Sequence, residues 1–236
     1  MNNVIRGMRC VIPAIWLVFA HMVQGQDASN IINVHKSPVG DYLREDYIKQ
    51  LRMRHSAVHA DIGDAPTLLE VDKRDKNLHV QTIINFHEGD VSLEWDGDKK
   101  VRVLDDGSQV GNVRLFADRS DSLMLEYGQH GLARYVFVGN AEQYVGRELL
   151  VGRYVSSDGK PYEFGQDGVA VFPDHTFKYV AGVDHVINHF DYLTDTESGK
   201  IFAFKRTGAD IELYNTSGPL SQVMDRSPLL KLKRIK

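Results

Sequence analysis

The feature that most constrains the fold is a period-two alternation of apolar and polar residues that begins near Leu68. The run 78–82, Leu-His-Val-Gln-Thr, shows it clearly, and such a pattern is typical of a strand with one buried face. Asp-Gly pairs separate several of these runs, and Asp-Gly favours the tight turns of β-hairpins. These pairs stand at 96–97, 106–107, 158–159 and 167–168. The sequence therefore predicts a mainly β protein with an antiparallel barrel or sandwich.

One segment near the N-terminus has a helical pattern instead. Within Asp41–Arg54, the residues Leu43, Tyr47, Ile48 and Leu51 recur at helical spacing with charged residues between them. This spacing predicts one short helix whose apolar stripe packs on the core.

Short sequence echoes suggest an internal duplication. Val-Gly-Asp-Tyr at 39–42 is echoed by Val-Gly-Arg-Tyr at 151–154, and His-Glu-Gly at 87–89 is echoed by Gln-Asp-Gly at 166–168. The segment 123–127 also resembles 211–214. On this hypothesis, one β-rich unit spans 39–145, with the helix as an insertion, and a second spans 151–236. The alternative is chance similarity among β-rich segments, and the pattern leaves open whether the units form two barrels or share one.

The first residues have the pattern of a signal peptide. Arg6 and Arg9 precede the apolar run Val11–Ala20, and small-residue cleavage sites follow. We expect residues 1–25 to be removed and 26–38 to form a flexible leader. The alternative is a retained anchor, but the run is shorter than the roughly 20 apolar residues that span a bilayer. The mature chain is expected to be secreted or periplasmic and not membrane-spanning.

Composition restricts both how the chain can be stabilised and which classes of partner it can bind. Cys10 is the only cysteine, so the mature chain has no cysteine and must be stabilised without disulfides. The net charge is −4, and no basic run is present, so we expect no nucleic-acid partner.

Several of these segments resemble a known group. Gly-Asp-Tyr at 40–42, followed by 46–51, Arg-His-Ser at 54–56 and Asn-Phe-His-Glu-Gly at 85–89, resembles uncharacterised bacterial secreted or envelope proteins. Gly-Arg-Tyr at 152–154, with 162–164 and 167–168, resembles lipocalin-like small barrels. The resemblance implies export and two tandem lipocalin-like units, and it implies no activity. Many members carry a lipid anchor on an N-terminal cysteine, which this chain lacks.

Two histidine clusters are candidates for chemistry. His87, Glu88 and Asp90 stand at a strand end and could provide acid–base catalysis or metal ligands; the alternative is a solvated hairpin turn. His185 and His189 would share a metal on a helix, whereas on a strand they lie about 13 Å apart. The alternative for them is a long polar loop over 182–193. No nucleophile-elbow, phosphate-loop or dinucleotide motif is present in the sequence, so no cofactor is expected.

Strand aromatics offer a binding function. Inside a barrel, such residues either fill the core or line a cavity for an apolar ligand. The candidates are Tyr154, Tyr162, Phe164, Tyr179, Phe202 and Phe204. The first hypothesis is a non-enzymatic envelope protein that binds a small apolar ligand or another envelope protein. The alternatives are a hydrolase using the cluster at 87–90, and a structural or interaction module without a pocket.

Overall fold

The structure is a computed structural model that describes residues 39–60, 65–74, 77–83, 89–95, 101–103, 113–183, 190–217 and 223–235. All of these residues belong to one compact unit, 32–236. The expected signal peptide and leader, 1–38, lie outside the described residues.

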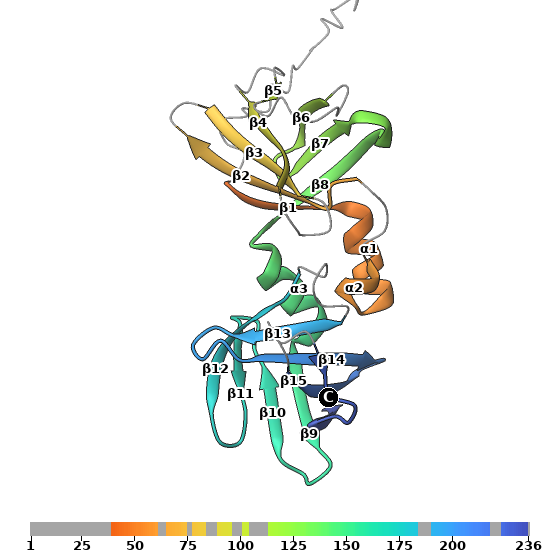
Figure 1. Ribbon diagram of the computed structural model, residues 1–236, viewed down its shortest axis with the longest axis vertical. Coiled ribbons are helices and arrows are strands. Elements are labelled where there is room, and N and C mark those ends of the chain that lie inside the picture. The colour runs from red at the N-terminus through yellow and green to blue at the C-terminus, as the bar shows by residue number, and fades with distance from the viewer. Residues whose placement is uncertain are drawn as a thin grey trace, which may run out of the picture. The chain divides into compact units, whose positions relative to one another are not determined.

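The first eight strands form one curled antiparallel sheet, here called the N-terminal sheet (Figure 1). Its strand order is β5-β4-β3-β2-β1-β8-β7-β6, so the first strand pairs with both the second and the last. Among the described residues, the two end strands β5 and β6 do not pair. The strands are β1 (Gly40–Arg44), β2 (Leu68–Arg74), β3 (Asn77–Ile83), β4 (Gly89–Trp95), β5 (Val101–Val103), β6 (Val113–Arg119), β7 (Ser122–Tyr127) and β8 (Leu132–Gly139).

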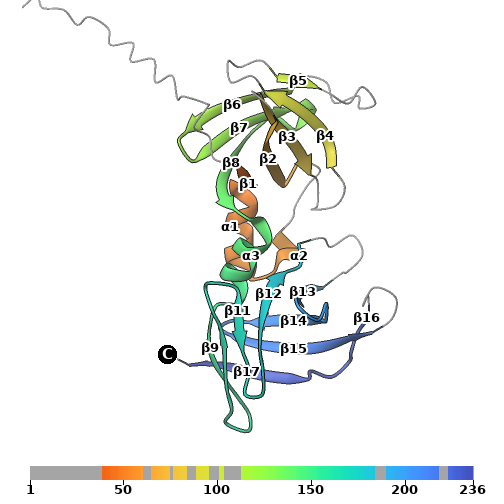
Figure 2. The same cartoon turned by 90° about the vertical axis from the view of Figure 1, so that its left-hand side faces the viewer.

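The later strands close into an eight-stranded barrel, here called the C-terminal barrel. Each strand pairs with the next, β17 returns to β9, and β15 pairs with β14 to complete the ring. A ninth strand, β16 (Val223–Met224), pairs with β15 at the end of the barrel (Figure 2). The barrel strands are β9 (Gly152–Ser156), β10 (Pro161–Phe164), β11 (Val169–Val171), β12 (Thr176–Ala181), β13 (Asp191–Asp195), β14 (Ile201–Thr207), β15 (Asp210–Ser217) and β17 (Leu230–Ile235).

The mainly β, antiparallel prediction is confirmed, and the two sheets share one topology. In each, the strands follow one another as a meander and the first strand pairs with the last. Gly40 and Gly152 begin the first strand of each sheet, and Tyr42 and Tyr154 are buried inside it. The echo at 87–89 and 166–168 does not follow this topology, because Gly89 begins β4, the fourth strand of its sheet, whereas 166–168 precedes β11, the third strand of the barrel.

The helices differ from the expectation. The segment 41–54 divides into β1 and the helix α1 (Glu45–Arg54), and two unpredicted helices follow, α2 (Ala57–Ala60) and α3 (Ala141–Leu150). Asn140 caps α3, since its side chain accepts a hydrogen bond from the Gln143 backbone nitrogen at 2.8 Å. The last residues of the loop expected over 182–193 belong instead to a strand, because β13 begins at Asp191.

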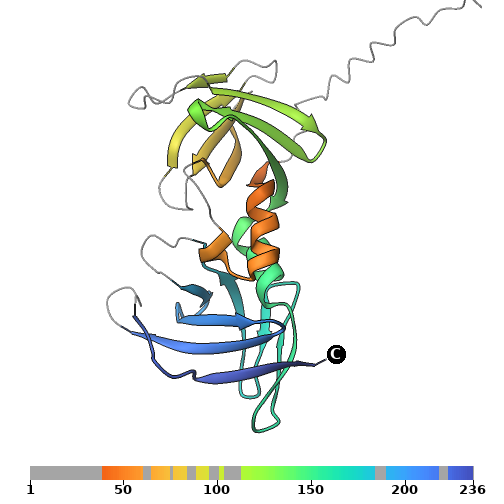
Figure 3. The ribbon, with the colours of Figure 1, turned by 90° about the vertical axis from the view of Figure 1, so that its right-hand side faces the viewer.

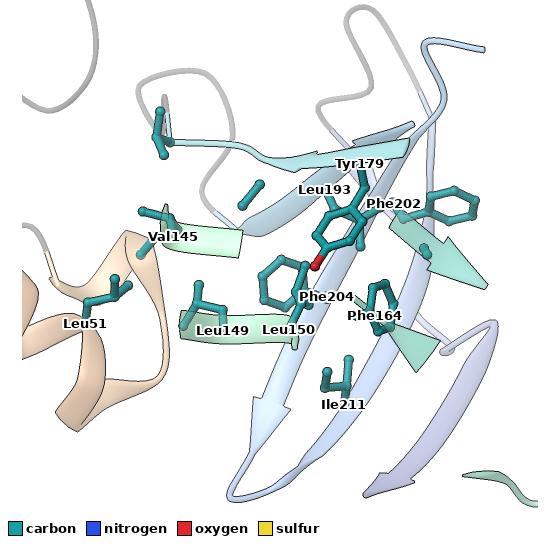
Figure 4. Packing of buried hydrophobic residues seen from close by; sticks show 14 of the residues in the cluster. Leu51, Val145, Leu149, Leu150, Phe164, Tyr179, Leu193, Phe202, Phe204 and Ile211 are labelled. Carbon is teal, nitrogen blue, oxygen red and sulfur yellow. The ribbon is translucent and has the colours of Figure 1, made fainter. Parts of the chain in front are cut away.

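Two hydrophobic clusters hold the protein together. One fills the N-terminal sheet, and the other fills the C-terminal barrel and extends onto the three helices. Figure 4 shows this second core, with Leu149 of α3 between Leu51 of α1 and the barrel residue Phe204. The helices inserted after β1 therefore share one core with the barrel and with Leu43, Leu68 and Ile83 of the N-terminal sheet.

Candidate ligand-binding site

The six aromatic candidates all lie inside the C-terminal barrel. They are between 0% and 8% exposed and belong to one continuous core. Their rings pack against one another and against α3, so in this structure they fill the core. That they bind a ligand stays a prediction.

Four of the six lie toward the end of the barrel that α3 covers. The Tyr154 hydroxyl donates a hydrogen bond to the Leu150 carbonyl at 2.8 Å, at the C-terminus of α3. The Phe164 ring makes edge contacts with the rings of Tyr154 and Tyr179 at 6.0 and 5.4 Å. Burial is the main reason why the pKa of both tyrosines is raised. Together with Phe204, these three residues fill the end of the barrel that α3 covers.

The other two candidates, Tyr162 and Phe202, lie at the opposite end of the barrel. Together with Phe172 and Phe177 they form a cluster that we call the aromatic end. The Tyr162 and Phe172 centroids are 4.9 Å apart, Phe172 and Phe177 are 5.1 Å apart, and Phe177 and Phe202 are 6.3 Å apart. The β9–β10 and β11–β12 turns lie at this end, away from α3 (Figure 3).

Charged groups surround the aromatic end. Lys200 Nζ lies 4.4 Å from the centroid of the Phe202 ring. The His175 ring stacks on Phe177 at 5.3 Å, and its side chain is 47% exposed. Asp174 Oδ1 lies 2.9 Å from His175 Nδ1, and this hydrogen bond lowers the pKa of Asp174. An apolar group held by the rings would thus have the Lys200 ammonium group within reach of its polar end.

Sequence reasoning did not place Phe172 or His175 at this site. Phe172 follows β11 and its backbone nitrogen donates to the His175 carbonyl at 2.8 Å, which closes the turn that brings the two rings together. Pro-Asp at 173–174 is a recognisable turn signal. That signal predicts the turn, but the stacking of His175 on Phe177 depends on the barrel.

The histidine clusters are not tested by the described residues. His87, Glu88, His185 and His189 lie outside them, and Asp90 belongs to β4 without a described side chain. Within the described part of the chain, no group of three His, Cys, Asp or Glu side chains is arranged to hold a metal ion. None of the helices described is long and apolar enough to cross a membrane.

A second group of titratable side chains lies where the N-terminal sheet contacts α3. Asp41 on β1 pairs in register with Glu70 on β2, and its Oδ2 accepts a hydrogen bond from the Ala141 nitrogen at 2.7 Å. Glu142 stands beside them in the first turn of α3. Burial is the largest cause that raises the pKa of all three carboxyls, and for Glu70 and Glu142 the charge of Asp41 adds to it. The folded protein therefore holds three carboxylates close together, and their burial and mutual repulsion lower its stability.

Comparisons of the chain with models of known protein families, with curated proteins and with solved structures gave no match.

Proposed function

We propose that the chain is an exported, non-enzymatic binding protein of the secreted or periplasmic space, and that the C-terminal barrel takes a small apolar ligand at the aromatic end. The observation that carries the proposal is the difference between the two ends of the barrel. At one end, Tyr154 hydrogen-bonds to the C-terminus of α3, whereas at the other end Lys200 and His175 lie beside four buried aromatic rings.

The energetics allow a ligand to enter between the rings. Each edge-to-face pair contributes about 0.5–1.5 kcal/mol beyond the area that it buries. Each methylene of a ligand gains about 0.8 kcal/mol on burial. An acyl chain that separates Tyr162 from Phe172 therefore offsets the lost ring contact with a few methylenes, and it keeps its own contacts with both rings.

The resemblance to secreted or envelope proteins with lipocalin-like units supports the exported-barrel part of the proposal. The interior of a closed eight-stranded barrel is either filled by side chains or wide enough for one small ligand, so the proposal requires some of the rings to move apart. Docking of another envelope protein at the aromatic end is the competing outcome, which the experiment below distinguishes.

The test places a reporter at the site itself. Trp95 lies in β4 of the N-terminal sheet, so its emission does not report on the barrel. In a chain that starts at Gln26, the double variant Trp95→Phe, Tyr162→Trp has its only tryptophan at the aromatic end. Titration with a long-chain fatty acid should change its emission in a saturable way.

Matched variants separate the site from general effects. In that background, Phe202→Ala should weaken fatty-acid binding by about tenfold, whereas Phe137→Ala in the N-terminal sheet should not change it. Lys200→Glu, at an exposed position, should weaken binding of the fatty acid but not of the matching alcohol. If no apolar ligand saturates the signal, or if Phe202→Ala and Phe137→Ala bind equally well, the proposal is wrong and a pull-down from envelope extract becomes the next experiment.

A further inference from the structure

Tyr127 has a buried hydroxyl without a partner. It lies on β7 in the core of the N-terminal sheet, and its residue is 5% exposed. Among the described residues, its hydroxyl oxygen is buried and has no hydrogen-bond partner. Buried hydroxyls are nearly always paired, because an unpaired one costs about 1–3 kcal/mol. Such a group in an otherwise apolar interior indicates a partner that comes from outside the chain.

Another tyrosine of the same core shows the usual arrangement. The Tyr135 hydroxyl, one strand away on β8, donates to the Pro66 carbonyl at 2.6 Å. The two tyrosines share a core cluster, yet only one hydroxyl is satisfied by the protein. This contrast provides a matched pair of positions for an experiment.

The surroundings of Tyr127 define the chemistry of its partner. Every buried member of the core cluster is apolar or aromatic, and none is charged. Among the buried members of this cluster an ionised group would meet no counter-charge, and burying an unpaired ion costs far more than burying a neutral acceptor. The His130 ring, whose centroid is 6.0 Å from that of Tyr127, is exposed and lies outside the cluster. The other buried members are Tyr42, Leu69, Val71, Val80, Leu93, Leu115, Leu123, Leu125 and Tyr135.

Tyr127 lies one strand from an end of the sheet. Its strand pairs with β6, and Tyr127 stands opposite Val113 at the beginning of that strand. β6 is an end strand of the sheet, and among the described residues it does not pair with β5.

We propose that the interior of the N-terminal sheet is a second binding site, for a small apolar molecule with an uncharged carbonyl oxygen, and that the Tyr127 hydroxyl donates a hydrogen bond to this oxygen. The site is independent of the one proposed in the C-terminal barrel, because it uses other strands and a different core.

The natural reporter for this site is Trp95, which lies on β4 of the same sheet. The probes are a long-chain methyl ketone and an alkane of equal length, which differ in the carbonyl oxygen. With the mature chain, the ketone should change Trp95 emission and bind more tightly than the alkane. Tyr127→Phe should reduce ketone affinity by about three- to tenfold and leave alkane affinity unchanged.

The control is Tyr135→Phe. It should lower the urea midpoint of unfolding, because the Pro66 carbonyl loses its donor, and it should keep the preference for the ketone. Tyr127→Phe should leave that midpoint unchanged or raise it, since it removes only an unpaired group.

Three outcomes would overturn the proposal. The first is equal ketone affinity of the natural chain and Tyr127→Phe. The second is a loss of stability in Tyr127→Phe as large as in Tyr135→Phe, which would show that the hydroxyl has a partner within the protein. The third is that the ketone neither changes Trp95 emission nor raises the melting temperature. None of these outcomes affects the barrel proposal, whose reporter is Tyr162→Trp.

Discussion

Oδ1 of Asp191 lies 2.7 Å from the backbone nitrogen of Ala57, a residue 134 positions earlier in the chain. The same oxygen accepts a hydrogen bond from the Val58 nitrogen at 3.0 Å. Asp191 begins β13 of the C-terminal barrel, and Ala57 begins α2, which is inserted between the first two strands of the N-terminal sheet. One buried carboxylate thus satisfies the free nitrogens of a helix that belongs to the other half of the sequence.

This contact gives a stability prediction. Asp191→Ala should lower the free energy of unfolding by about 1–3 kcal/mol, because one buried and one half-buried donor lose their acceptor. Asp191→Asn should cost less, since the amide oxygen still accepts. Urea denaturation followed by circular dichroism measures both. Asp72→Ala, at an exposed position on β2, is the control and should change the value by less than about 0.5 kcal/mol. An equal loss in Asp191→Ala and the control would contradict the prediction.

Arg206 provides a second prediction. Its Nη1 donates to the carbonyls of Glu148 and Leu149, each at 3.0 Å, at the C-terminus of α3. Burial lowers the pKa of this guanidinium, so the protein holds it there against a desolvation cost. Arg206→Met should lower the free energy of unfolding by about 1–3 kcal/mol, because helix carbonyls and helix dipole lose their partner.

The same denaturation experiment tests it. Arg206→Lys should recover only part of the loss, since lysine keeps the charge but not the planar group. Arg153→Gln, whose ion pair with Glu163 is exposed, should have little effect. If Arg153→Gln costs as much as Arg206→Met, the assigned role of Arg206 is wrong.

The cluster of three carboxyl groups at Asp41, Glu70 and Glu142 leads to a prediction about how stability depends on pH. Because the pKa of each is raised in the folded protein, the folded state binds more protons than the unfolded state between the ordinary and the raised values. The loss of folding free energy caused by the raised pKa values is full at pH values above them. It becomes smaller as the pH falls toward about 4.5, the ordinary pKa of glutamate.

Glu70→Gln isolates this effect. At neutral pH it should raise the free energy of unfolding, by less than about 1 kcal/mol because Glu70 is solvent-screened. The gain should shrink as pH falls toward 4.5, where the natural side chain becomes protonated. Denaturation series at several pH values measure it, with Glu197→Gln in an exposed turn as the control. A gain that grows on acidification would have the wrong sign.

Gly40 makes a steric prediction. Its φ is +134°, and a Cβ built there would lie 2.7 Å from the Gly139 carbonyl oxygen on β8. Gly40→Ala should therefore cost about 1–3 kcal/mol, through backbone strain together with the displacement of β8. Gly131→Ala is the matched control, because its φ is also positive, at +75°, but nothing lies within 4 Å of the added atom. Equal losses in a thermal melt of the two variants would show that the approach of β8 does not matter.

The sequence by itself determined the class of fold. Alternation along the strands decides which side chains face a core, and Asp-Gly fixes turns through the backbone of two residues. Both signals are local, so they can be interpreted from the sequence without knowing which strands pair. Even the division of 41–54 into β1 and α1 shows the limit, because Leu43 fits the helical stripe of Tyr47 and Leu51 but is buried as part of a strand.

Tertiary structure decided everything that depends on which strands meet. Only barrel closure, through the pairing of β14 with β15 and of β17 with β9, brings aromatic rings from separate strands together in one core. Only the packing of the N-terminal sheet leaves the Tyr127 hydroxyl unpaired while Tyr135 finds Pro66. The reason is physical: periodicity specifies burial, but hydrogen-bond partners and ring contacts come from residues far apart in the chain, and no local pattern encodes their meeting.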